Sequence, residues 1–445
     1  MLDTIAVTPA QQQRAMWLST FAFTVCFAVW TIFSIIGIQI KKDLELSETA
    51  FGLLIATPIL SGSLTRLFLG IWADQFGGRL VLTVVMLCAA VATWMLSWAH
   101  SLPQFMIGAL FVGLAGGSFS VGVAYVSKWF PANRQGTALG IFGAGNVGAA
   151  VTKLIAPMIM VAAGWMMVAK VWAIAIAVVA ILFYVFSQDD PSLAERRKIG
   201  AKPMSFREQM APLKNIQVWR FALYYFFVFG GFVALALWLP HFLTGAYGLD
   251  IRTAGLFAAA YSIPASLFRV VGGWLSDKVG ARTVMYWTFG VSTLCTFVLC
   301  YPDTQYIVKG IEGDIQLHLA IGLVPFTVLV FVLGFFMSLG KAAVYKHIPV
   351  YYPNHVGSVG GVVGMIGGLG GFIMPIAFGA MNDLTGVWTS CFMLLFLVVA
   401  AALAWMHFAI RRMERASFPQ IGKQTDLPEI INAAKDDQAV AALVR

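Results

Sequence analysis

Apolar runs long enough to cross a membrane recur along the whole chain. A helix of about 20 apolar residues spans the hydrocarbon core of a bilayer. The runs are continuous rather than alternating, which favours helices over the strands of a membrane barrel. Only 11% of the 445 residues are charged, whereas a soluble domain carries about 25% charged residues. The sequence therefore predicts an all-α integral membrane protein and excludes a soluble globular domain.

Twelve such runs can be placed, and one polar segment divides them into two sets of six. The predicted helices are 16–40, 51–73, 80–99, 103–128, 136–160, 164–187, 218–243, 253–275, 282–301, 318–347, 356–381 and 386–411. The expected organisation is an N-terminal half at 1–187, a cytoplasmic linker loop at 188–217, a C-terminal half at 218–412 and a cytoplasmic tail at 413–445. The first run is longer than the apolar region of a cleaved signal peptide, so we expect it to be retained.

Basic residues predict the orientation of these helices. If both termini are cytoplasmic, 20 of the 29 Lys and Arg residues fall on the inner side. Those left in outer loops are Lys41, Lys42, Arg252 and Lys309. The net charge of +9 is then mostly a topology signal, and its dispersal among loops argues against a nucleic-acid partner.

The two halves contain an internal repeat. The pattern Gly-x-x-x-Asp-x-x-Gly-x-Arg ends both the second and the eighth spans, with Gly70, Asp74 and Arg79 in one copy and Gly273, Asp277 and Arg282 in the other. Repeats around a central site are typical of secondary transporters that expose the site alternately to each side. The pattern resembles the signature of the major facilitator superfamily, which implies twelve helices in two pseudo-symmetric bundles. We expect these residues to act in gating, because the glycines allow close helix approach and the charged residues can pair with neighbouring helix ends.

Charged residues inside the spans are all cations. The spans contain Arg66, Arg269, Lys153 and Lys341, whereas all 20 Asp and Glu residues lie in loops, tails or at helix ends. An ionisable group in the hydrocarbon region marks a functional site by default. A bound anion would supply the missing negative charge, and two guanidinium groups suit a small planar oxyanion. For the two lysines, bonding to nearby backbone remains an equal alternative.

Glycines concentrate in the fifth and eleventh spans. They are Gly143, Gly145 and Gly148 in one span, and Gly367, Gly368, Gly370 and Gly371 in the other. Tight packing explains such residues in any membrane protein. Their matching positions in the two halves also predict helices that slide and bend during transport. Asn146 adds a neutral hydrogen-bonding group within the first set.

These residues together resemble one family, the nitrate/nitrite porters of the major facilitator superfamily. The resemblance covers residues 16–411 and rests on the paired arginines, on Gly-Ala-Gly-Asn-Val-Gly and on Gly-Gly-Leu-Gly-Gly-Phe. It implies that Arg66 and Arg269 clamp the anion and that Asn146 donates to it. It also implies that Phe119 and Phe229 cover its two faces and that Tyr225 contributes a hydroxyl group, although core packing is an alternative for these aromatic residues.

The sequence thus predicts a transporter of nitrate, nitrite or both that works by alternating access in a bacterial cytoplasmic membrane. The first span resembles that of nitrate–proton symporters, so we expect a proton as co-substrate. The lack of a core carboxylate favours the alternative, nitrate/nitrite antiport. Another small-anion or drug transporter of this fold is less favoured. An enzyme is disfavoured because the six histidines are scattered. We expect a monomer without metal or other cofactor.

Overall fold

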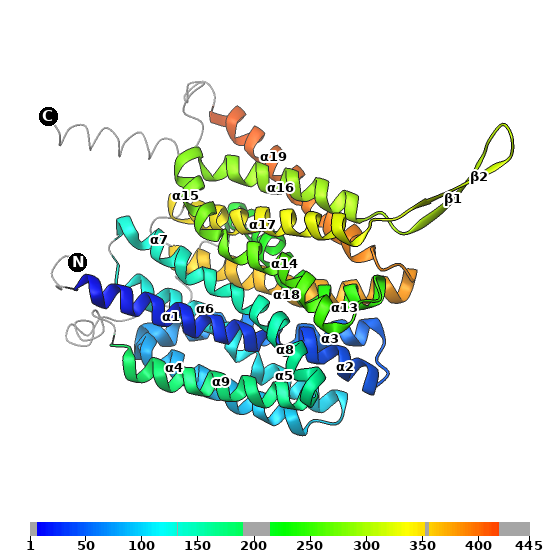
Figure 1. Ribbon diagram of the computed structural model, residues 1–445. Helices are drawn as coiled ribbons and strands as arrows, with labels where there is room; N and C mark the ends of the chain where they lie inside the picture. Colours follow the sequence, from blue (N-terminus) through cyan, green and yellow to red (C-terminus); the bar gives the residue numbers. More distant parts are fainter. Residues whose placement is uncertain (1–6, 131, 190–213, 352–355, 418–445) are drawn as a thin grey trace.

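The computed structural model describes residues 7–130, 132–189, 214–351 and 356–417, which form a bundle of helices (Figure 1). The N-terminal half contains α1 (Pro9–Trp30), α2 (Phe33–Asp43), α3 (Glu48–Phe76), α4 (Gly78–Met95), the 3₁₀ turn η1 (Leu96–Trp98), α5 (Leu102–Val112), α6 (Leu114–Ser127), α7 (Ala132–Gly143), the 3₁₀ turn η2 (Ala144–Val147), α8 (Gly148–Ala163) and α9 (Trp165–Phe186). The C-terminal half contains α12 (Ile216–Tyr225), the π-helical turn η4 (Phe226–Gly231), α13 (Phe232–Ala246), α14 (Ile251–Leu267), α15 (Arg269–Val279), α16 (Ala281–Leu299), β1 (Thr304–Lys309), β2 (Asp314–Leu319), α17 (Leu323–Tyr351), α18 (Val356–Thr385) and α19 (Ser390–Ser417).

Eleven stretches of the described chain are long and apolar enough to cross a membrane. They coincide with all of the predicted spans except the ninth, 282–301. That prediction falls on α16, a helix of 19 residues that packs against α17 and α19. In the other half α4 packs in the same way against α6 and α9, so α16 takes the equivalent place in the repeat.

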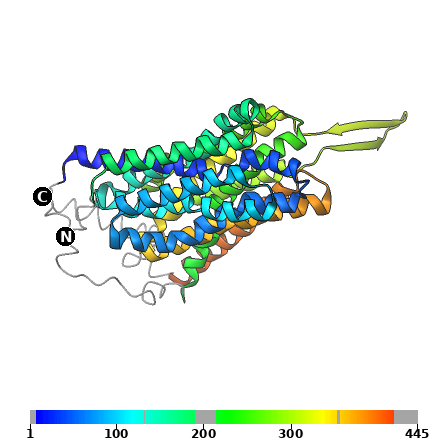
Figure 2. The same cartoon turned by 90° about the horizontal axis from the view of Figure 1, so that it is seen from below.

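The predicted start of the tenth span, at residue 318, is wrong. Residues 304–319 form an antiparallel hairpin in which Thr304 pairs with Leu319 and Lys309 with Asp314. The sequence Asp-Ile-Gln-Leu-His-Leu of β2 alternates polar and apolar residues, which is the period of a strand. The hairpin projects from one end of the bundle (Figure 2), and α17 begins only at Leu323.

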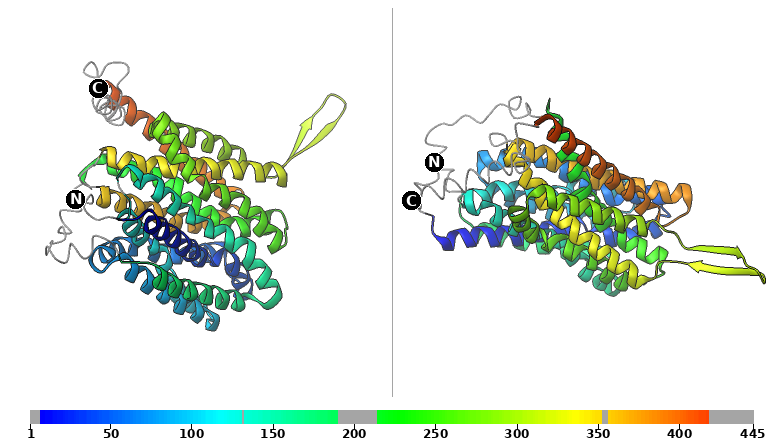
Figure 3. Two further views of the ribbon diagram at one scale, coloured as in Figure 1. Left: turned by 60° about the vertical axis from the view of Figure 1, so that its left-hand side comes forward. Right: turned by 90° about the horizontal axis from the view of Figure 1, so that it is seen from above.

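The bundle has two distinguishable ends. The hairpin marks one of them, whereas α1 begins and α19 finishes at the opposite end (Figure 3). We call these the hairpin end and the termini end. Polar side chains cap the N-termini of several helices. Ser47 caps α3 by accepting from the Ala50 amide, and Asp250 caps α14.

The internal repeat is present in the backbone as well as in the sequence. Gly77 ends α3 with φ 93° and ψ 138°, and Gly280 ends α15 with φ 86° and ψ 138°. This conformation strains any residue that carries a Cβ. The same glycine turn therefore links the second span to the third and the eighth to the ninth.

The two halves meet along two symmetric pairs of helices, α3 with α18 and α8 with α14. Five of the described spans are interrupted: the first at Thr31, the fourth at Gly113, the fifth at η2, the seventh at η4 and the eighth at Phe268. The outer helices α9, α16 and α19 run unbroken, and α4 changes only at its last turn. The outer helices carry exposed apolar side chains such as Val91, Ile181, Leu294 and Phe408, as expected of a surface that faces lipid.

Candidate functional site

Arg66 projects from the middle of α3 into the interface between the halves and is only 3% exposed. Its Nε donates to the carbonyl of Gly116 on α6 at 3.3 Å, and its Nη1 donates to that of Gly364 on α18 at 3.2 Å. The guanidinium carbon lies 5.3 Å from the ring centre of Phe119 and 5.0 Å from that of Phe229. Arg66 is thus anchored by carbonyls from both halves and enclosed by aromatic rings.

Arg269 is the first residue of α15, directly after the break at Phe268. It is 6% exposed, and its guanidinium carbon lies 5.5 Å from the ring centre of Phe119 and 5.8 Å from that of Tyr345. A Cβ added at Gly143 would come within 3.1 Å of the Arg269 side chain. Arg269 therefore lies directly against the glycine-rich fifth span of the opposite half.

Phe119 brings the two arginines into one site. Its ring lies within 5.5 Å of both guanidinium carbons, although one arginine belongs to each half. Phe23 and Phe142 pack on the same ring, with ring centres 5.5 and 5.8 Å away. This aromatic support fixes Phe119 between the two cations.

Several polar atoms around these arginines are buried and lack a hydrogen-bond partner among the described residues. They are Arg66 Nη2, Arg269 Nη1, Asn146 Oδ1 and Nδ2, and the hydroxyl oxygen of Tyr225. Leaving such a group unsatisfied costs about 1–3 kcal/mol, and more when the group is charged. Both halves thus contribute buried, unsatisfied donors to this site.

The predicted aromatic residues lie at this site. Phe229 belongs to the π-helical turn η4 and stacks on Tyr225, with ring centres 5.1 Å apart and ring planes 6° apart. A Cβ at Gly367 would come within 2.3 Å of the Tyr225 ring. Asn146 lies on η2, three residues after Gly143, and so on the same helix face as the residue that Arg269 contacts.

The two glycine-rich spans make complementary contacts across the interface. Arg269 rests on Gly143, while Arg66 binds the Gly364 carbonyl and lies 3.6 Å from a Cβ position at Gly368. The other glycines serve close packing: Gly145 and Gly148 lie against α1, and Gly370 and Gly371 lie against η4 and α13. Each arginine therefore occupies space that glycines of the opposite half leave open.

The predicted gating residues are partly described. Arg79 donates from Nε and Nη2 to the Tyr184 carbonyl near the end of α9, at 3.1 and 2.7 Å. Gly70 lies near Ser120, and Gly273 has open space around it. Arg282 lies in the first turn of α16. The side chains of Asp74 and Asp277 lie outside the described residues.

The two buried lysines bond to backbone, but in different ways. Lys153 donates to the Ala149 carbonyl of its own helix at 3.0 Å. Lys341 reaches from α17 to the Ala265 carbonyl of α14. Its Nζ also lies 3.6 Å from the ring centre of Phe232. Of the two ammonium groups, that of Lys341 therefore bonds to the helix turn directly before Arg269, whereas that of Lys153 bonds within its own helix.

Sequence reasoning missed a polar cluster that joins the halves at the hairpin end. We call Lys41, Glu48, His241 and Asp383 the hairpin-end latch. Glu48 of α3 binds Lys41, and its Oε2 lies 2.7 Å from His241 Nε2 of α13. Asp383 of α18 accepts from the backbone amides of Glu48 and Thr49 at 3.0 and 2.8 Å. The only sequence signal was the position of these residues at helix ends, because the partners are up to 335 residues apart.

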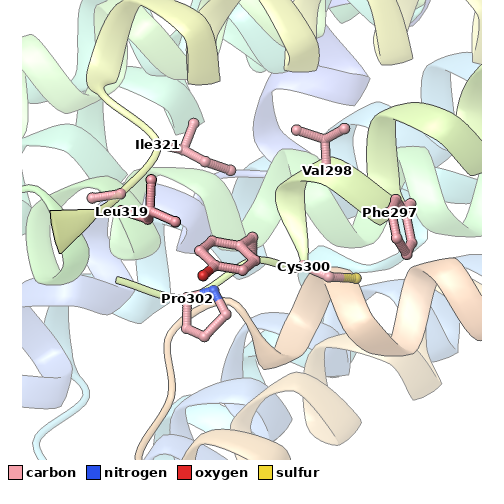
Figure 4. Close-up of a pocket in the computed structure, with 8 residues that line it drawn as sticks. Phe297, Val298, Cys300, Pro302, Leu319 and Ile321 are labelled. Atoms are coloured by element: carbon pink, nitrogen blue, oxygen red, sulfur yellow. The ribbon is translucent and has the colours of Figure 1, made fainter. Parts of the chain in front are cut away.

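An apolar hollow lies apart from this site, at the base of the hairpin (Figure 4). It is lined by Phe297, Val298, Cys300, Tyr301, Pro302, Leu319, Ala320 and Ile321. None of these side chains carries a positive charge, so the hollow offers nothing to an anion.

The chain is similar in sequence to known membrane transporters. Residues 18–309 match the Major Facilitator Superfamily. A probable nitrate/nitrite antiporter, NarK1 of Thermus thermophilus, is 42% identical over 413 residues, covering 90% of this chain and 92% of its own. A nitrite extrusion protein of Bacillus subtilis is 31% identical, covering 90% of this chain and 96% of its own. A probable nitrate transporter, NarT of Staphylococcus aureus, is 30% identical, covering 87% of this chain and 92% of its own.

Solved structures show the same fold. A bacterial homologue of the human lysosomal transporter Spinster, in an inward-facing and occupied conformation, aligns with a TM-score of 0.65 over 91% of this chain and 98% of its own, at 15% identity. The inward-facing and unoccupied form aligns with a TM-score of 0.62 over 90% of this chain and 96% of its own. The twelve-helix architecture predicted from the repeat is therefore shared with transporters of known structure.

Proposed function

This chain belongs to the nitrate/nitrite transporters of the major facilitator superfamily, and we propose that Arg66 and Arg269 hold the transported anion between its two halves. One observation carries the proposal. Buried guanidinium groups from both halves lie against the same Phe119 ring, and each has a nitrogen without a partner among the described residues. A planar anion with three acceptor oxygens can satisfy donors on both sides at once.

The neighbouring groups suit a small planar ion. Phe119 and Phe229 lie on the Arg66 guanidinium, so apolar faces border the space where the anion would bind. Asn146 and Tyr225 offer further buried donors. Such a site selects against larger anions, because rigid rings and glycine-lined backbone leave them little room.

Alternating access follows from the charges. With an anion bound, each arginine approaches the glycine-rich span of the opposite half and the two cations are bridged. Without an anion, two like charges in a low-dielectric interface repel each other and disfavour the closed arrangement. The anion binds the closed state more tightly and therefore shifts the population toward it.

We propose that transport is coupled to a proton. The alternative, nitrate/nitrite exchange, is supported by the Thermus relative, which is named a probable nitrate/nitrite antiporter, and by the lack of a carboxylate in the predicted spans. Coupling to a proton is supported by the buried Lys341, which bonds to the Ala265 carbonyl one turn before Arg269. We also propose that the protein works as a monomer in the bacterial cytoplasmic membrane, with the termini end in the cytoplasm.

Purified protein in liposomes tests the function directly. Nitrate uptake is measured with and without an imposed proton gradient, and with or without nitrite inside the vesicles. We expect gradient-driven uptake into nitrite-free vesicles. Uptake that needs internal nitrite and ignores the gradient would establish exchange, and no nitrate movement under any condition would refute the proposed anion site.

A further inference from the structure

We propose that Lys341 is the proton-binding site of the transport cycle, and that it takes up one proton together with each anion. The inference rests on the proposed function and adds the group that carries the co-substrate. Lys341 is fully buried in α17, in the half of the protein that also carries Arg269.

The surroundings of Lys341 contain cations and neutral groups. Its ammonium group donates to the Ala265 carbonyl and lies over the Phe232 ring. Among groups that can carry charge, Arg269 comes from α15, Tyr261 from α14, and Tyr345 from α17 itself. The Tyr261 hydroxyl is directed to the sulfur of Met337.

Carboxylates do not neutralise this region. No Asp or Glu occurs in the sequence at 216–246, 251–276, 281–299 or 323–351, and these ranges cover most of the helices packed against α17. Asp277 and Asp383 come only at the ends of α15 and α18. The protonated lysine therefore adds a third cation to a site that already contains Arg66 and Arg269.

Lysine is the only one of these three cations that can give up its charge, since a guanidinium group stays protonated in proteins. When the anion leaves, repulsion from the arginines favours loss of the Lys341 proton. When an anion bridges the arginines, its negative charge favours the protonated amine. Anion and proton therefore strengthen each other's binding, and this linkage is reciprocal.

The contact with Ala265 connects Lys341 to the anion site mechanically. Ala265 lies one turn before Arg269, and α14 stops at Leu267. The Ala265 carbonyl, in the last turn before the break at Phe268, accepts from the lysine. A change in the charge of Lys341 therefore acts on the backbone that orients Arg269.

Lys153 is a matched control within the same chain. It is also fully buried in a span and has no acidic partner within the described ranges, but its nitrogen bonds to Ala149 on its own helix. Substituting it removes an equally buried lysine without touching the break before Arg269.

The first experiment uses wild-type protein in liposomes that contain a pH-sensitive dye and no nitrite. External nitrate should acidify the lumen with close to one proton per nitrate. Because one proton and one monovalent anion carry no net charge, a potassium-diffusion potential should leave the rate unchanged. Nitrate entry without acidification would overturn the proposal but leave nitrate transport intact, whereas absence of nitrate entry would refute the proposed function itself.

The second experiment compares Lys341→Arg, Lys341→Gln and Lys153→Gln. Arg keeps a charged donor for Ala265 but cannot release a proton, and Gln keeps a neutral donor. Both Lys341 variants should still exchange nitrate for nitrate, at reduced rates, while accumulation driven by a proton gradient falls at least about tenfold. Lys153→Gln should still accumulate nitrate.

Three outcomes would contradict the assignment. Lys341→Arg accumulating nitrate as the wild type does would show that a fixed charge suffices. Loss of exchange as well as accumulation in both Lys341 variants would give Lys341 a purely structural role. Loss of coupling only in Lys153→Gln would place the proton on the other lysine.

Discussion

Arg66 and Arg269 occupy equivalent positions in the repeat, yet the two halves hold them differently. Arg66 projects from an uninterrupted helix and donates to carbonyls of Gly116 and Gly364. Arg269 follows a helix break, and its neighbours include the rings of Phe119 and Tyr345 and the open surface at Gly143. Sequence symmetry therefore places the two cations, but it does not make them alike.

The difference assigns separate tasks to the two arginines. Arg66 has little freedom, because two hydrogen bonds and three aromatic rings fix its guanidinium group. Arg269 has more freedom, since no carbonyl among the described residues accepts from its side chain and its helix begins only after the break at Phe268. The N-terminal half thus supplies a fixed part of the site, and the C-terminal half supplies the part that responds to the anion.

Replacing each arginine by lysine should have the largest effect on nitrate uptake. It also tests directly whether Arg66 and Arg269 have separate tasks. Losing the paired donors of a buried, charge-assisted contact costs about 2 kcal/mol or more, which is about 30-fold in affinity. We expect Arg66→Lys and Arg269→Lys both to lose most nitrate uptake. Only Arg66→Lys should also lower the thermal stability of the anion-free protein, because it alone loses bonds to Gly116 and Gly364.

Uptake and melting temperature, measured with and without nitrate, separate these effects. Near-normal uptake in both lysine variants would defeat the arginine clamp. Equal losses of stability in the two variants would defeat the distinction between a fixed and a responsive arginine.

Adding a methyl group beside each arginine should have a smaller effect. It tests whether the surroundings of Arg66 are more rigid than those of Arg269. At Gly368 a Cβ would come within 2.2 Å of Ser63 Oγ, beside the fixed Arg66. At Gly143 it would come within 3.1 Å of Arg269, whose side chain can move. Overpacking in a rigid site costs about 1–3 kcal/mol, so Gly368→Ala should destabilise the protein more than Gly143→Ala. Thermal unfolding in detergent checks the order, and a larger loss for Gly143→Ala would contradict it.

Tyr225 and Tyr345 lie beside the arginines and should differ in how much they contribute to nitrate affinity. The Tyr225 hydroxyl has no partner within the described part of the chain, whereas the Tyr345 hydroxyl donates to Gly360 at 3.0 Å. A hydrogen bond to an anion contributes about 1.5 kcal/mol, so Tyr225→Phe should weaken nitrate binding about tenfold. Tyr345→Phe should change the affinity less. Nitrate-binding isotherms on the purified variants test this. A nitrate affinity of Tyr225→Phe equal to that of the wild type would show that Tyr225 is not part of the site.

The smallest expected effect concerns the start of α3, the helix that carries Arg66. Asp383 of the opposite half accepts from the amides of Glu48 and Thr49 there. A negative charge at a helix N-terminus contributes about 0.3–1 kcal/mol, so Asp383→Asn should shift the open population at the hairpin end by up to about fivefold. Distances between spin labels at the exposed positions Asp43 and Leu384 would report the shift. An unchanged distance distribution would show that the hairpin-end latch does not hold the halves together.

Most of the fold could be predicted from the sequence, because spans of apolar residues and a repeated motif leave few alternatives. The burial of Arg66 and Arg269 could also be predicted, since both are charged residues within apolar spans. The sequence predicts that the glycine-rich spans pack tightly and slide. The structure also places Gly143 and Gly368 against arginines of the opposite half, where a larger side chain would leave less room.

The remaining features depend on contacts that no local pattern encodes. The hairpin-end latch joins Glu48 to His241 and Asp383, and only the assembled bundle brings them together. Lys341 could be recognised as buried, but its bond to Ala265 depends on a break in a different helix. The hairpin is not predicted, because its two strands are only six residues long and the last two residues of β2, His318 and Leu319, fall within the predicted tenth span.

The interrupted helices of the inner layer also affect how amide hydrogens exchange with solvent. At each break some amides lack the regular carbonyl partner one turn earlier, and local opening there needs little energy. The continuous outer helices have their amides paired throughout and are shielded by lipid. Hydrogen exchange should therefore be fastest around Thr31, Gly113 and Phe268 and slowest in α9 and α19. In this protein the interrupted inner spans are therefore expected to be less protected than the continuous helices that face lipid.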